Sequence, residues 1–138
     1  MAQHTFDEAA RSRYAESFRI TDFNKMMDGK VVVVTGASYG MGKMMAQVMV
    51  EQGAKVFVTA RGKEKLDAAI ADIKEKTGGE ICGMTLDSSK PEDCERVFPE
   101  AIKAYGKVDV LINNAGKGEL ITIDAVSNEM IDLSLIHI

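Results

Sequence analysis

The stretch that decides the fold is Val31-Val-Val-Val-Thr-Gly-Ala-Ser-Tyr-Gly-Met-Gly42. Its four consecutive valines predict a short strand that is buried on both faces, as in a parallel sheet. Gly36 allows a sharp exit from this strand, and Gly40 and Gly42 let a phosphate and the strand approach without a Cβ between them. An amphipathic helix follows at once, and the N-terminus of a helix attracts anions. The stretch therefore predicts a nucleotide pyrophosphate site, and a glycine turn without a ligand is the alternative.

The glycine spacing excludes two common phosphate loops. A P-loop needs a hydroxyl residue where Met44 stands and a first glycine where Ala37 stands. The fingerprint G-x-G-x-x-G also fails, because the residue three positions after Gly42 is Met45. The pattern that is present, beginning at Thr35, is T-G-x-x-x-G-x-G.

The composition is that of a small globular domain. The chain has 138 residues, 46% of them hydrophobic, which suits one domain with a modest core. Its 17 basic and 21 acidic residues give a net charge of −4, which favours no nucleic-acid partner. No apolar run approaches the roughly 20 residues of a membrane span, and no signal peptide is visible. Cys82 and Cys94 lack metal-ligand spacing and are interpreted as reduced packing residues, so we expect a cytoplasmic protein with neither a metal site nor a membrane partner.

The rest of the chain alternates between strand and helix patterns. Short apolar runs predict strands at 31–34, 56–59, 81–86 and 108–113, and amphipathic spacing predicts a helix after each of the first three. The apolar residues predicted to face the core from the first helix are Met41, Met44, Met45, Val48 and Met49. An apolar stripe within residues 1–27 predicts an N-terminal helical extension.

This alternation predicts an α/β fold, namely a Rossmann-like doubly wound parallel sheet with its four strands in the order 3-2-1-4. A ligand binds such a sheet beyond the carboxyl ends of its strands, where the strand order reverses. The glycine turn after the first strand and the Asn-Ala-Gly after the fourth strand both fall at that point. The fold and the glycine motif therefore predict the same site.

Over about residues 28–132 the sequence resembles the short-chain dehydrogenase/reductase family. The resemblance rests on the glycine turn, on Asp87 after the third strand, and on Asn-Asn-Ala-Gly at 113–116, which Asp109 precedes. In this family the glycine turn binds the cofactor, the aspartate usually contacts the adenine ring, and the asparagine motif braces the sheet and lines the cleft. The cofactor-binding residues that the resemblance and the turn together predict are Gly36, Ser38, Tyr39, Gly40, Met41, Gly42, Arg61, Asp87, Ser88, Asn114, Ala115 and Gly116.

The end of the second strand indicates the cofactor. An NAD enzyme carries an acidic residue there, which accepts hydrogen bonds from the ribose and repels a 2′-phosphate. This chain has Ala60 followed by Arg61, and a guanidinium suits a phosphate dianion in charge and in geometry. The sequence therefore favours NADP over NAD. A solvated turn residue is the alternative interpretation of Arg61.

No catalytic residue is assigned. The family uses a tyrosine and a lysine four positions apart on a later helix, where the tyrosine exchanges a proton with the substrate oxygen. In this chain Tyr14 and Tyr105 have no lysine four positions on, and the pair Tyr39 and Lys43 lies inside the phosphate turn. We therefore expect the N-terminal cofactor half of an oxidoreductase. The resemblance implies a small carbonyl or secondary alcohol substrate and a homo-oligomeric parent protein. A non-catalytic dinucleotide-binding or interaction module is the alternative.

The last six residues, Leu-Ser-Leu-Ile-His-Ile at 133–138, break the resemblance. The codons CTG-TCT-CTT-ATA-CAC-ATC encode the same six residues, and that DNA matches the end of a widely used sequencing-library transposon. We therefore expect an adapter-derived tail at 133–138, after an N-terminal extension at 1–27 and an incomplete dinucleotide-binding domain at 28–132. Such a tail is kept out of fold reasoning and out of every site assignment.

Overall fold

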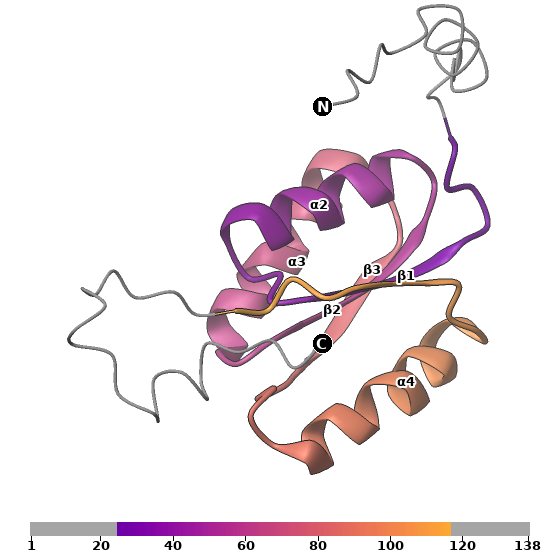
Figure 1. Cartoon of the computed structure of the whole chain (residues 1–138). Coiled ribbons are helices and arrows are strands. Elements are labelled where there is room, and N and C mark those ends of the chain that lie inside the picture. Colours follow the sequence, from indigo (N-terminus) through magenta and orange to yellow (C-terminus); the bar gives the residue numbers. More distant parts are fainter. Residues whose placement is uncertain (1–24, 117–138) are drawn as a thin grey trace, which may run out of the picture.

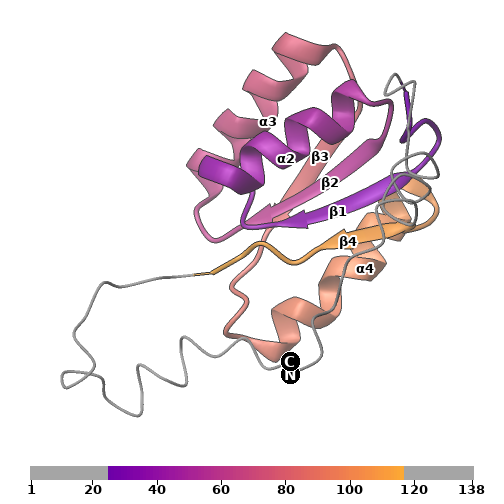
Figure 2. The ribbon, with the colours of Figure 1, turned by 45° about the horizontal axis from the view of Figure 1, so that its top comes forward.

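The computed structural model describes residues 25–116, and these residues alternate regularly between strand and helix. In chain order the elements are β1 (Val31–Thr35), α2 (Gly40–Glu51), β2 (Lys55–Ala60), α3 (Lys63–Thr77), β3 (Ile81–Thr85), α4 (Pro91–Tyr105) and β4 (Val110–Ile112). The strands form one parallel sheet in the order β3-β2-β1-β4. Helices α2 and α3 cover one face of the sheet and α4 covers the other (Figures 1 and 2). The predicted Rossmann-like fold and strand order are confirmed.

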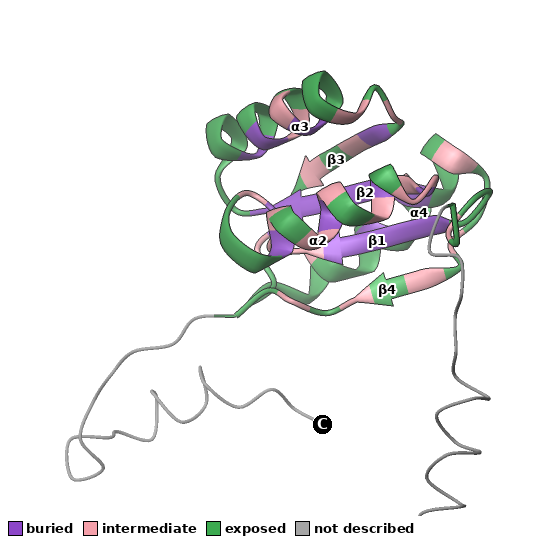
Figure 3. Cartoon of the chain, turned by 90° about the horizontal axis from the view of Figure 1, so that it is seen from above, coloured by how far each residue is buried: buried purple, intermediate pink, exposed green. Residues whose placement is uncertain are grey.

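The core is built around β1, which lies between β2 and β4. All four valines of β1 are at most 1% exposed, as predicted for a strand covered on both faces. Their side chains alternate between two clusters, because successive residues of a strand point to opposite faces of the sheet. Val32 and Val34 pack under α2 and α3, whereas Val33 packs toward α4 with Phe57 and Val97. Figure 3 shows β1 as buried over most of its length, and Thr35 at its end is half-buried.

The predicted buried face of α2 is wrong for three of its five residues, whereas Met49 packs against the core and Met45 is partly buried. Met41, Met44 and Val48 are 71%, 62% and 43% exposed, and the buried residues of α2 are Gly42, Ala46 and Val50. Small residues at positions i and i+4 let the start of the helix lie directly against the glycine turn, a position that a methionine side chain would not allow. A prediction from hydrophobicity alone places the large methionines on the buried face of α2, whereas the close contact with the turn requires small residues there.

One smaller feature also differs from the sequence prediction, since strand β4 is shorter than the predicted 108–113. Helix α4 begins after Lys90, and no side chain caps it. Within residues 25–116 no helix is both long enough and apolar enough to cross a bilayer. The predicted extension at 1–27, apart from its last three residues, and the predicted tail at 133–138 lie outside the described residues.

Candidate nucleotide-binding site

The turn after β1 is held in a conformation that requires its glycines. Gly36 has φ +68° and Gly40 has φ +57°, a backbone region that other residues rarely adopt. Between them the N–H of Ala37 donates to the carbonyl oxygen of Thr59 at 3.0 Å, which ties the turn to the end of β2. Gly42 is buried, and a Cβ placed on it would collide with the Gly36 carbonyl oxygen and with Nδ2 of Asn114. The glycine turn is therefore a closely packed element.

Hydrogen bonds join this turn to the end of β4. The hydroxyl oxygen of Thr35 accepts the N–H groups of Asn114 and Ala115, each at 3.0 Å. In the other direction, Nδ2 of Asn114 donates to the carbonyl oxygens of Thr35 and Gly36, at 3.0 and 3.2 Å. The side chains of Thr35 and Asn114 thus fix the two loops that meet where the strand order reverses. Thr35 opens the glycine motif but was not among the site residues predicted from the sequence.

Asp109 braces the opposite end of the same strand pair. Its Oδ2 accepts the backbone N–H of Val31 at 2.8 Å and lies 2.9 Å from Nζ of Lys107. The hydrogen bond from Lys107 and then the one from Val31 hold the pKa of Asp109 below its ordinary value. The carboxylate therefore stays ionised at neutral pH and fixes the start of β4 beside the start of β1.

Arg61 and Asp87 follow the ends of β2 and β3, two strands that pair in the sheet. Residue Ala60 lies opposite Thr85 in the β2–β3 register, and the N–H of Leu86 donates to the carbonyl oxygen of Ala60 at 2.9 Å. The carboxylate of Asp87 accepts hydrogen bonds from the hydroxyl and the N–H of Ser89, at 2.7 and 3.1 Å. The Ser89 hydroxyl is the main cause of the lowered pKa of Asp87, and the charge of Arg61 adds to it.

These contacts make Asp87-Ser88-Ser89 a turn of their own, and they do not cap α4, whose first residues follow Lys90. Ser88 and Gly116, both assigned to the site from the sequence, are exposed.

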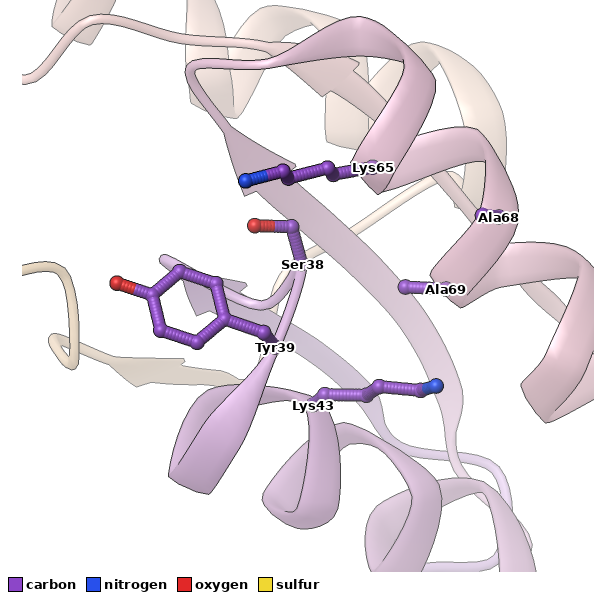
Figure 4. A pocket seen from close by; sticks show the side chains of 6 residues that line it. All are labelled: Ser38, Tyr39, Lys43, Lys65, Ala68 and Ala69. Atoms are coloured by element: carbon purple, nitrogen blue, oxygen red, sulfur yellow. The ribbon is translucent and has the colours of Figure 1, made fainter.

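A shallow pocket of about 370 Å³ opens between the glycine turn and α3. Its walls are Ser38, Tyr39, Lys43, Lys65, Ala68 and Ala69 (Figure 4). Tyr39 and Lys43 point in different directions, since Nζ of Lys43 lies 2.6 Å from Oδ2 of Asp72 on α3 while the Tyr39 ring extends away from that helix. This divergence agrees with leaving the pair out of the catalytic assignment. Lys43 and Lys65 line the pocket but were not among the site residues predicted from the sequence.

The structure brings most of the predicted site residues to one edge of the sheet. Residues 36–42, Arg61, Asp87 and 114–116 all lie just beyond the carboxyl ends of the parallel strands. The glycine turn contacts Asn114 and Ala115 directly, and the charge of Arg61 contributes to the lowered pKa of Asp87. The described residues at this edge include no group of three or more His, Cys, Asp or Glu side chains that could hold a metal ion.

A parallel sheet with a glycine turn before a helix at the strand-order reversal defines a nucleotide-binding α/β domain. Comparison with known proteins identifies the family: residues 30–137 match the family described as short chain dehydrogenase. The chain belongs to the short-chain dehydrogenase/reductase family of oxidoreductases.

Similar proteins include several that are named as dehydrogenases or reductases. The chain is 34% identical over 108 residues to "11-beta-hydroxysteroid dehydrogenase 1A" of Arabidopsis thaliana, an alignment covering 78% of this chain and 31% of that protein. The structure of L-sorbose reductase from Gluconobacter frateurii, complexed with NADPH and L-sorbose, aligns with a TM-score of 0.70 at 33% identity. That alignment covers 78% of this chain and 40% of the reductase. The structure of actinorhodin polyketide ketoreductase (F189W) with NADPH aligns with a TM-score of 0.71 at 34% identity, covering 75% of this chain and 40% of the ketoreductase. The chain therefore spans less than half the length of these relatives.

Proposed function

We propose that this chain binds NADP(H) across the glycine turn as part of an oxidoreductase that acts on a carbonyl or secondary alcohol. The observation that carries the proposal is that hydrogen bonds hold the glycine turn against the loop after β4, at the point where the strand order reverses. In addition, Arg61 follows β2 where an NAD enzyme has an acidic residue. In this proposal the cofactor-binding residues are those predicted from the sequence.

The N-terminus of α2 fits a pyrophosphate. No side chain caps this helix and its first turn contains no acidic residue, so its backbone N–H groups are open to an anion. A Cβ on Gly40 would meet no atom within 4 Å, so the space beside this residue is open. Gly42, by contrast, is needed for packing against Gly36 and Asn114. The two glycines therefore serve the site in different ways.

The two ends of the dinucleotide have separate partners in this proposal. At the adenosine end, the ionised carboxylate of Asp87 accepts hydrogen bonds from the adenine amino group, and the guanidinium of Arg61 pairs with the 2′-phosphate. Toward the nicotinamide end, Ala115 and Gly116 line the cleft. When bound, the cofactor supplies or accepts the hydride, and the residues described here hold and orient it.

Two of the relatives support the class of substrate and the choice of cofactor. L-Sorbose reductase was solved with NADPH and L-sorbose, and the ketoreductase was solved with NADPH. A small carbonyl or alcohol substrate and a homo-oligomeric whole protein are proposed on the same family basis.

Titration of the 138-residue chain with NADPH and with NADH, followed by nicotinamide fluorescence, tests this proposal. We expect NADPH to bind at least about tenfold more tightly, since one charge-assisted contact to the 2′-phosphate is worth that much. Equal affinities would contradict the NADP assignment, and binding of neither nucleotide would contradict the proposed site.

A further inference from the structure

The pocket beside the glycine turn is basic. Its lining includes two lysines, Lys43 and Lys65, together with the hydroxyl of Ser38, and it includes no carboxylate. It lies between the turn that follows β1 and the first turns of α3, next to the end of β2 (Figure 4). In a doubly wound nucleotide-binding fold, the residue at the end of the second strand faces the 2′ position of the adenosine ribose. The pocket therefore lies beside the position that a 2′-phosphate would occupy.

The two lysines differ in their partners. Nζ of Lys43 lies 2.6 Å from Oδ2 of Asp72, and the same oxygen accepts a hydrogen bond from Lys76 at 2.9 Å. Both lysines lower the pKa of Asp72, so Lys43 is already part of a compensated cluster between α2 and α3. The only charge of the pocket lining without such a partner among residues 25–116 is that of Lys65.

The position of Lys65 in its helix is locally unfavourable. It is the third residue of α3, within the first turn, where the helix dipole repels cations. The nearby Lys63 is compensated by Asp67 one turn further on, at 2.8 Å, and Lys65 has no equivalent contact among the described residues. Its side chain extends from α3 toward the Ser38 hydroxyl (Figure 4). An anion held between Ser38 and Lys65 would compensate both the unpaired charge of Lys65 and the positive end of the α3 dipole.

We infer that Lys65 determines cofactor specificity together with Arg61, by contacting the 2′-phosphate of NADP(H) from the side of the pocket. Arg61 directly follows β2, whereas Lys65 on α3 and Ser38 in the glycine turn line the pocket beside that turn. In this inference the phosphate is held by Arg61 and by the two pocket residues together. This inference rests on the proposed function, since it requires that NADP(H) binds at the glycine turn.

The test compares the wild-type chain with Lys65→Met, which removes the charge and keeps most of the side-chain length. Lys65 is exposed, so the variant is expected to fold. We expect the Kd for NADPH to rise about tenfold, the low end for a charge-assisted contact because the lysine is exposed, and the Kd for NADH to stay within about twofold. Lys65→Arg retains the charge and should restore NADPH binding to within about threefold of wild type.

Lys74→Met is the matched control, because Lys74 lies in the last turn of the same helix and its loss changes the net charge equally. We expect this control to leave both affinities unchanged. If wild type prefers NADPH but Lys65→Met binds it as wild type does, the inference about Lys65 is wrong and the proposed function stands. Equal weakening of NADPH and NADH by Lys65→Met, or an equal effect of Lys74→Met, would also overturn it. A wild-type chain without preference for NADPH would overturn the proposed cofactor, and the role of Lys65 with it.

Discussion

Gly42→Ala is expected to destabilise the chain and to abolish dinucleotide binding. Intrinsic helix propensity favours alanine over glycine by about 1 kcal/mol, so a change that concerned the helix alone would be stabilising. The added Cβ, however, would collide with the carbonyl oxygen of Gly36 and with Nδ2 of Asn114, two groups that already hydrogen-bond to each other. Relieving that collision requires α2 to move away from the β1–β4 junction. Overpacking of this kind costs about 1–3 kcal/mol, and more where backbone must shift, so we expect a net loss of about 2 kcal/mol.

Thermal unfolding monitored by circular dichroism measures this effect. A loss of about 2 kcal/mol corresponds to a decrease in Tm of roughly 10 °C for a domain of this size. Gly62→Ala is the matched control, since its φ is −91° and a Cβ there meets nothing within 4 Å. In Gly62→Ala the poorer N-cap lowers the free energy of unfolding, and the smaller entropy of the unfolded chain raises it. Each effect is about 1 kcal/mol or less, so the two nearly cancel. Equal Tm values for the Gly42 variant and wild type would show that the glycine turn is not closely packed.

Arg61→Ala is expected to remove most of the discrimination between NADPH and NADH. A hydrogen bond between a guanidinium and a phosphate is worth about 1.5–3 kcal/mol, which corresponds to a loss of about 10- to 150-fold in NADPH affinity. NADH lacks the 2′-phosphate, so its affinity should be nearly unchanged. Arg61 is exposed and directly follows β2, so its truncation should leave the fold intact.

Arg96→Ala provides the control for the loss of one guanidinium, because Arg96 belongs to α4. This helix covers the face of the sheet opposite to that covered by α2 and α3 (Figure 2). Arg96 pairs at 3.4 Å with Asp93, an exposed contact of little consequence. We expect Arg96→Ala to bind both cofactors as wild type does. If Arg61→Ala weakened NADPH and NADH equally, the guanidinium would act on a part that the two cofactors share, and the phosphate role would be refuted.

The fold could be predicted from the sequence because its signals are local and repeated. The four valines of β1 admit few structures other than a buried strand, and glycines that end α3 and α4, Gly78 and Gly106, have positive φ, as helix-ending glycines commonly do. The strand order follows from right-handed crossovers once the alternation is recognised. Once the strand order is known, the glycine turn in the sequence is enough to predict that the site lies where the strand order reverses.

The contacts between distant residues could not be predicted in the same way. The hydroxyl of Thr35 joins β1 to residues about 80 positions further along the chain, and no spacing rule connects them. The buried face of α2 was also hidden, because the close approach of the helix selects Gly42 and Ala46 by size, whereas a hydrophobic pattern selects Met41 and Met44. The charge of Lys65 becomes informative only when its neighbours in space are known.

The most direct test of the account is to map NADP⁺ binding onto the ¹⁵N-labelled chain by NMR. We predict that the largest amide shifts occur at residues 36–42, with smaller ones at Arg61, at Lys65 and at residues 114–116. Shifts centred instead on Lys74, Glu80 and Tyr105, which line a separate pocket against β3, would place the ligand elsewhere. That result, or the absence of any shift at saturating NADP⁺, would contradict the claim that the glycine turn is the cofactor site.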